Sequence, residues 1–103
     1  MRNLIGSEKQ VAWAEKIRAG MVENLSDEEK FIGMDFSSFT LESIFGEAVC
    51  RDRLKAASAA ARAAGGDIEC RKNAKRIELK RMAAEALGII ENESSAVWFI
   101  EHR

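Results

Sequence analysis

The sequence contains no proline and no tyrosine, a single histidine and only two cysteines. Without proline, helices must end at glycines, capping side chains and polar clusters. The longest apolar run, residues 96–100, is far shorter than the roughly 20 residues that span a bilayer. The N-terminus shows no apolar stretch preceded by basic residues, as a secretory signal would require. These absences predict a cytoplasmic protein that does not contact membranes.

The scarcity of histidine and cysteine restricts the available chemistry. Cys50 and Cys70 form no CxxC motif, and one pair cannot hold zinc without further ligands. A cysteine nucleophile needs a base, and His102 lies one residue from the C-terminus, where chains are usually mobile. Residues 65–66 lack the Lys-Ser/Thr that follows a phosphate-binding glycine loop. We therefore predict no catalytic site, metal or cofactor, and two reduced, half-buried cysteines that serve in packing.

The size and composition are those of one globular domain. The 103 residues are 47% hydrophobic and 32% charged, so the chain can form a core without disulfides or metals. We find no internal repeat and no linker. The prediction is a single helical domain over residues 1–103.

The first helix has the clearest signal. Ser7 and Gln10 form a capping box, in which each side chain binds the backbone amide of the other residue. Apolar residues then recur at three- and four-residue spacing, namely Val11, Ala14, Ile17, Met21 and Leu25. This pattern predicts a helix over residues 8–25.

Weaker signals follow in the middle of the chain. Ser26 and Glu29 repeat the capping box, which predicts a short helix over 27–32 that ends at Gly33. The next segment carries three large apolar residues, Met34, Phe36 and Phe39, and is predicted to be a connection pinned across the core.

Two longer helices are expected after this connection. Thr40 is a candidate cap for a helix that ends at residues 65–66, with a bend or change of face at residues 51–53. Asp67 is the candidate cap of a helix over 68–87, which Gly88 terminates.

The C-terminal segment, Ala96–Arg103, fits either a strand or a short helix. Ser94 or Ser95 as a cap favours the helix. Trp13 and Trp98 follow the core spacing of their segments, so we expect Trp98 and Ile100 to be buried near Trp13. The fold class predicted is all-α, a small compact bundle of four to five helices with little or no sheet.

Charge is distributed unevenly along the chain, although the net charge is only −1. Residues 51–81 carry ten basic and four acidic side chains, a net +6. Six of the basic residues lie within eleven positions and are offset only by Glu78: Arg71, Lys72, Lys75, Arg76, Lys80 and Arg81. On a helix, Lys72, Arg76 and Lys80 line up, which predicts a stripe that binds phosphates or an acidic protein surface.

One alternative to this binding role stays open at the level of sequence. The stripe also fits an ordinary solvated helix face balanced by the acidic N-terminal half. Single-stranded nucleic acid is the less suitable ligand, because the segment has no aromatic side chain to stack on a base.

Two stretches of the sequence show a family resemblance. Residues 4–18 resemble the pattern L-x-G-[ST]-x-K-Q-x-x-W-A-x-x-I-R of small, largely uncharacterised proteins of bacteriophages and mobile elements. Ala96, Trp98, Ile100 and Arg103 resemble their A-x-W-W-I-x-x-R ending, with Phe99 in place of the second tryptophan. The basic stripe lies outside this resemblance. The resemblance implies a setting, the cytoplasm of a host bacterium, and no established activity.

Two functional hypotheses result from these observations. The first is a non-enzymatic inhibitor or adaptor of a phage or mobile element that occupies a surface of a bacterial host protein complex, with an anti-CRISPR-like role as one form. The second is an accessory protein that binds nucleic acid directly through residues 51–81.

Overall fold

The computed structural model describes residues 1–26 and 37–103, which form helices joined by short connections. The elements are α1 (Glu8–Ser26), α3 (Ser37–Phe45), α4 (Glu47–Ala63), α5 (Ile68–Asn92) and α6 (Ala96–Glu101). Within the described ranges there is no strand longer than one isolated bridge. The predicted all-α class with four to five helices is confirmed.

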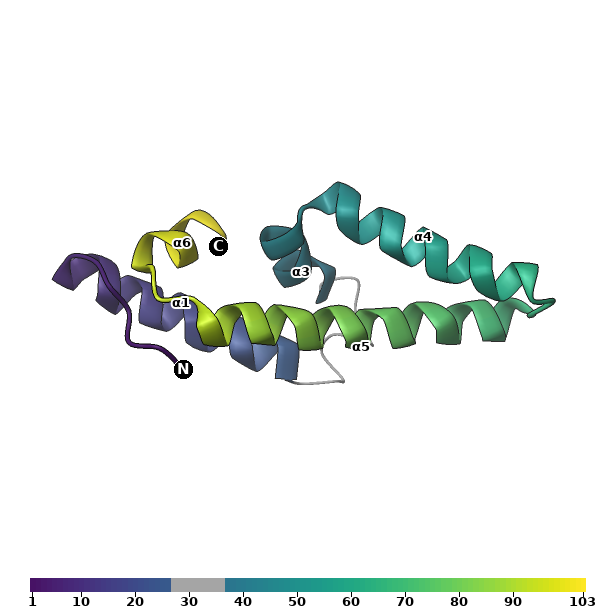
Figure 1. Cartoon of the computed structure of the whole chain (residues 1–103), viewed down its shortest axis with the longest axis horizontal. Helices are drawn as coiled ribbons and strands as arrows, with labels where there is room; N and C mark the ends of the chain where they lie inside the picture. Colours follow the sequence, from purple (N-terminus) through teal and green to yellow (C-terminus); the bar gives the residue numbers. More distant parts are fainter. Residues whose placement is uncertain (27–36) are drawn as a thin grey trace.

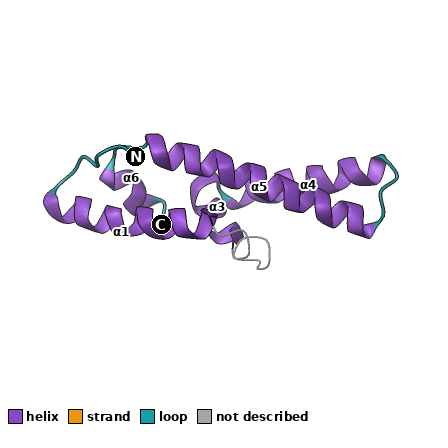
Figure 2. Ribbon diagram, turned by 90° about the horizontal axis from the view of Figure 1, so that it is seen from below, coloured by secondary structure: helices purple, strands orange, loops and turns teal. Residues whose placement is uncertain are grey.

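The helices are arranged along α5, which runs through most of the length of the molecule (Figure 1). At one end α1 packs against the C-terminal half of α5, and α3 and α6 pack against α1. At the other end α4 folds back antiparallel to α5 (Figures 1 and 2). The extents are 54 × 23 × 19 Å and the radius of gyration is 15.5 Å. A spherical chain of this length would have a radius of gyration of about 13 Å. The α4–α5 hairpin therefore projects from the bundle.

The core lies at the bundle end. Its largest fully buried side chains are Phe99, Leu41, Met82 and Ile90, and smaller members include Ala14, Ala86 and Ala96. No helix in the described part of the chain is long and apolar enough to cross a membrane.

The N-terminal segment is hydrogen-bonded to the start of the C-terminal segment, Ala96–Arg103, here called the tail. The capping box of α1 is confirmed, with bonds from the Ser7 amide to Gln10 Oε1 (3.0 Å) and from the Gln10 amide to Ser7 Oγ (3.2 Å). Ile5 bridges to Ser95 in parallel, donating to Ser94 and accepting from Ala96. The Trp98 amide donates to Ser95 Oγ at 3.3 Å, which confirms both the predicted cap and the helical form of the tail.

The predicted start of the third helix was wrong. Helix α3 begins at Ser37, so Thr40 lies inside the helix instead of capping it. The Thr40 hydroxyl is buried and accepts a hydrogen bond from Asn24 Nδ2 at 3.3 Å, which joins α3 to α1. The predicted helix over 27–32, together with Met34, Phe36 and the side chain of Phe39, lies outside what the structure describes.

At two glycines the helix boundaries differ from the predictions. Gly46, with φ of 92°, separates α3 from α4, so the break lies before residues 51–53, where a bend or change of face was expected, and α4 runs through those residues as one helix. Gly88 does not end α5, contrary to prediction, because the helix continues to Asn92. A glycine inside a helix costs about 1 kcal/mol, and the buried Ile90 in the following turn offsets that cost.

The turn of the hairpin agrees with the prediction. Gly65 has φ of 83°, and a Cβ atom on Gly66 would lie 2.8 Å from both the Ala61 carbonyl oxygen and Cys70 Cβ. Asp67 caps α5 by accepting from the Cys70 amide at 2.9 Å. This hydrogen bond lowers the pKa of the Asp67 carboxyl.

The two tryptophans differ in how far they are buried. Trp98 packs against the core: its ring is perpendicular to that of Phe99, with the centroids 5.0 Å apart, and is stacked on that of His102, with the centroids 4.2 Å apart. Trp13 is 47% exposed, so its predicted place in the core was wrong. The Arg103 guanidinium lies 4.3 Å above the Trp13 ring, so the C-terminal end of the chain meets this tryptophan through a cation–π contact.

Candidate binding surface on the helical hairpin

All six predicted binding residues lie on α5, in the part that pairs with α4. Arg71 is half-buried, and the other five are exposed: Lys72, Lys75, Arg76, Lys80 and Arg81. A helix advances 100° per residue, so these six side chains spread over most of the circumference of α5. Lys72 and Arg81, nine residues apart, point in opposite directions. The six cations therefore do not form one surface.

Three of the cations gather on one side of the hairpin. Arg71, Lys72 and Lys75, here called the basic cluster, lie within about 100° of arc and line an open hollow of about 310 Å³. The remaining walls are Ser58 from α4 and Ile68 from the first turn of α5. Lys72 Nζ is 4.0 Å from Glu69 Oε1, with both side chains mostly exposed, and a pair of that kind is weak.

Arg71 is the least exposed of these six cations. Its Nε atom is enclosed and has no hydrogen-bond partner among residues 1–26 and 37–103. An enclosed N–H without an acceptor costs about 1–3 kcal/mol. An oxyanion in the hollow would lie beside the Arg71 side chain, with Lys72 and Lys75 adding charge.

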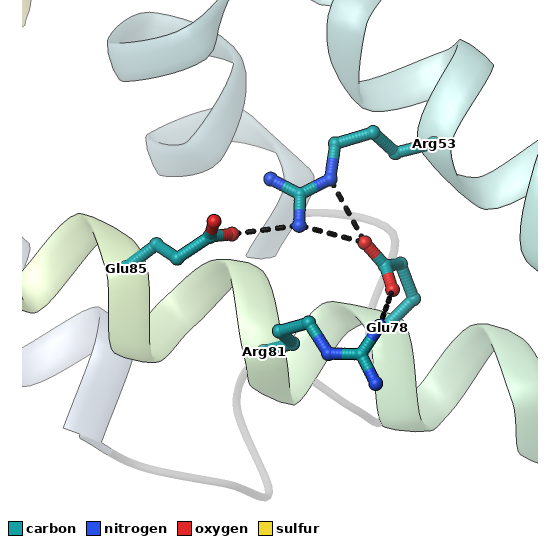
Figure 3. A network of polar contacts seen from close by, with 4 residues as sticks. All are labelled: Arg53, Glu78, Arg81 and Glu85. Carbon is teal, nitrogen blue, oxygen red and sulfur yellow. Dashed lines mark hydrogen bonds and ion pairs between the residues drawn. The ribbon is translucent and has the colours of Figure 1, made fainter.

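Arg81, by contrast, belongs to an ion-pair network that joins the two helices of the hairpin (Figure 3). Glu78 on α5 is buried, and its two carboxylate oxygens accept from different arginines. Arg53 on α4 places Nη2 2.7 Å from Glu78 Oε1 and 2.6 Å from Glu85 Oε2. Arg81 Nη1 lies 2.9 Å from Glu78 Oε2.

This network has a structural role. Burial lowers the pKa of Arg53, but the hydrogen bonds and charges of Glu85 and Glu78 outweigh burial and raise the pKa overall. Arg53 also lies over the Phe45 ring, 5.9 Å from its centroid, and so ties α3 to the hairpin. One side of α5 thus uses its cation internally, and the basic cluster on the other side stays available to a partner.

Sequence reasoning missed Ser58, Ile68 and Arg53. Ser58 had a usable signal, since it is the one hydroxyl in the alanine-rich run of α4. Ile68 is 61% exposed, and its position directly after the cap gave no reason to expect it beside three cations. Arg53 and Glu78 are 25 residues apart, so only the closed hairpin brings them together.

The cysteines and acids form no further site in the described ranges. No group of three or more His, Cys, Asp or Glu residues is arranged to hold a metal there. Cys50 is buried, but Cys70 is exposed, so the expectation that both are half-buried was wrong. Burial and the charge of Glu42 raise the pKa of Cys50, with Arg53 opposing them.

This difference predicts selective alkylation. Iodoacetamide attacks thiolates that it can reach, so Cys70 should react in the native protein. Cys50 should react only after unfolding in urea, because it is buried and its raised pKa disfavours the thiolate. Peptide mass mapping before and after urea measures both sites. Early labelling of Cys50 would contradict its position in the core.

The hairpin therefore carries a cationic hollow on one side and an internally paired network on the other. Comparison of the chain with protein-family models, curated proteins and solved structures found no match.

Proposed function

We propose that this protein is a non-enzymatic binding protein that docks its projecting hairpin on an acidic surface of a bacterial host protein complex, as an inhibitor or adaptor. The observation that carries the proposal is the basic cluster around the hollow at Ser58 and Ile68. The hairpin extends away from the core end of the molecule (Figure 2), so a partner can approach this side without displacing α1 or α6.

Ile68 favours a protein over a phosphate backbone as the partner. It is a large apolar side chain, 61% exposed, that lines the same hollow as the three cations. Protein interfaces typically combine an apolar centre with a polar rim. A duplex presents phosphates at its edge and offers little apolar surface to such a residue. The partner surface that fits is a shallow apolar patch bordered by Asp or Glu.

Direct nucleic-acid binding is the second candidate, and Arg71 favours it. Its side chain lines the hollow and its Nε has no acceptor among the described residues, so a phosphate that displaces this side chain slightly would supply one. In both cases the expected setting is the cytoplasm of a host bacterium. The resemblance of residues 4–18 to phage and mobile-element proteins supports that setting, and an anti-CRISPR-like role is one form of the proposal.

The proposed function is tested by removing two charges from the basic cluster. The variant Lys72→Gln with Lys75→Gln keeps residues that favour helix, and stability should change little because both side chains are exposed. Capture of the partner from nuclease-treated bacterial lysate should fall by roughly tenfold, the effect of losing two charge contacts at an interface rim. Quantitative mass spectrometry of the captured proteins measures this.

The matched control is Lys9→Gln with Lys16→Gln, which removes the same charge from exposed positions on α1. It should capture as the wild type does. Gel shifts with duplex DNA and RNA at two salt concentrations test the second candidate. Binding whose salt slope flattens by about two contacts in the hairpin variant would favour nucleic acid. Equal capture by both variants and the wild type would refute the role of the basic cluster.

A further inference from the structure

The side of the hairpin opposite the basic cluster carries two seams of mostly small or aliphatic residues, with one arginine in each. On α4 the seam is Val49, Arg53, Ala56, Ala60 and Ala63. On α5 it is Cys70, Ala74, Ile77, Arg81 and Ala84. Both run at alternating four- and three-residue spacings, the heptad spacing by which helices pack along their length. Most of these side chains are exposed, so both seams point outward from the hairpin.

Between the seams lies an open groove of about 490 Å³. Its lining is mainly alanine from α4, at positions 56, 57, 60 and 61, with Ala74 and Ile77 from α5. Ile77 is 51% exposed beside this hollow. The same surface therefore presents a large apolar side chain and, next to it, an apolar hollow without a large side chain. In a twofold-symmetric dimer, the side chain of each copy can enter the hollow of the other copy, because every contact occurs twice. A surface that has both a large apolar side chain and a hollow therefore suits such a dimer.

The groove faces away from the rest of the molecule. Ala86 lies nine residues after Ile77, which places it on the opposite side of α5. Ala86 is fully buried in the core. The core side of α5 is thus the side away from Ile77, and the bundle does not cover the groove.

Charge at the groove favours a second copy of the chain over an acidic partner. The charged residues of its lining are Arg53, Glu78 and Arg81. Glu85 lies outside the lining and pairs with Arg53, so the network at the groove holds two charges of each sign. This network therefore has no net charge to select an acidic surface, and two copies meet without net repulsion. Arg81 and Glu85 are exposed by 66% and 49% at their side chains and stand one helical turn apart. A twofold axis can set each of them against its opposite in the other copy.

We infer that two copies of this chain associate through the groove, with Ile77 of each copy entering the alanine-lined hollow of the other to form a four-helix arrangement. The 17 residues of α4 extend for about 25 Å. Two helices about 9 Å apart then cover roughly 500 Å² per copy, or about 1,000 Å² in total, the lower end for specific interfaces. The dimer is reversible and leaves both basic clusters on its outer faces. This inference does not depend on the proposed function.

Sedimentation equilibrium, from low micromolar to several hundred micromolar chain, tests the association. The wild type should pass from 11.4 kDa towards twice that mass as concentration rises. Ile77→Glu and Ala60→Glu should each raise the dissociation constant by at least about tenfold, because both put a charge into the apolar contact. Neither site is buried, so circular dichroism should show unchanged helix content.

The controls are matched by residue and by helix. Ile68→Glu changes an exposed isoleucine on the other side of α5, and Ala59→Glu changes the neighbouring exposed alanine, which does not line the groove. Both should dimerise as the wild type does. A wild type that stays at 11.4 kDa throughout would overturn the inference, as would four variants with equal dissociation constants. Should the wild type be monomeric and Ile77→Glu lose a partner from lysate, a different protein occupies the groove and the second copy is excluded.

The two proposals fail separately in these experiments. Ile77→Glu is expected to be monomeric and to keep its capture of the acidic partner at low concentration. Lys72→Gln with Lys75→Gln is expected to dimerise and to lose that capture. A dimer that forms without any partner binding would sink only the proposed function, and partner binding by a strict monomer would sink only the dimer.

Discussion

Phe99→Ala is expected to lower the free energy of unfolding by about 3–5 kcal/mol, the range for deleting a large aromatic side chain from a core. Phe99 is completely buried and packs edge-on against Trp98. It sits in α6, a helix of six residues, which is too short to be stable alone and depends on its contacts with α1. The same change therefore removes packing and loosens the tail. Urea unfolding followed by circular dichroism gives the difference.

Val97→Ala provides the comparison within the same helix. Val97 is 39% exposed, so its truncation should cost less than about 1 kcal/mol. If Phe99→Ala unfolded at the same urea concentration as Val97→Ala, α6 would not be docked on the bundle through Phe99.

Helix starts were predictable from the sequence wherever the signal is local. Ser7, Asp67 and Ser95 each place an oxygen within three residues of the amide that it accepts from. Such a bond forms whenever the helix forms, so the residue pattern and the structure agree. Thr40 has the same chemistry, but its hydroxyl bonds Asn24 from another helix, and a single-sequence pattern does not distinguish the two uses.

Helix ends were less predictable, and the glycines show why. Gly46 adopts a positive φ and ends α3, whereas Gly88 stays helical. Neither glycine has a neighbour within 4 Å of an added Cβ, so local space does not decide between the two conformations. The later residues decide, because Ile90 needs helical geometry to reach the core from α5. After Gly46 the chain changes direction into α4 (Figure 1).

The candidate site was predictable in its residues and not in its grouping. Charge counting finds the six cations, but it does not show that Glu78, the neighbour of Arg81, also pairs with Arg53 of α4, or that Arg71 Nε is enclosed. The link between Arg53 and Glu78 is a consequence of how α4 lies on α5. A pattern along one helix defines which residues share a face, and the neighbouring helix decides which of those faces a partner can reach.

Glu78→Ala is expected to lower the free energy of unfolding by about 2–3 kcal/mol. Breaking a fully buried ion pair costs about 3–5 kcal/mol, and a smaller value applies here because the Arg53 side chain is 27% exposed. The loss leaves Arg53 with Glu85 alone and removes the hydrogen-bond acceptor of Arg81. Glu85→Ala is the matched control: it removes the same kind of contact to Arg53 from a half-exposed position, so less than about 1 kcal/mol is expected.

The double variant Arg53→Met with Glu78→Leu separates two accounts of this loss. If the cost of Glu78→Ala comes from leaving a cation desolvated, removing both charges should restore most of the lost stability, since apolar replacements of buried pairs are often neutral. If the cost comes from the alignment of α4 on α5, the double variant should stay about 2 kcal/mol below the wild type. We expect restoration, because the alanine contacts between the two helices remain. Urea unfolding of the wild type, Arg53→Met, Glu78→Leu and the double variant measures the coupling. A double variant less stable than Glu78→Ala would show that the network itself sets the register of the hairpin.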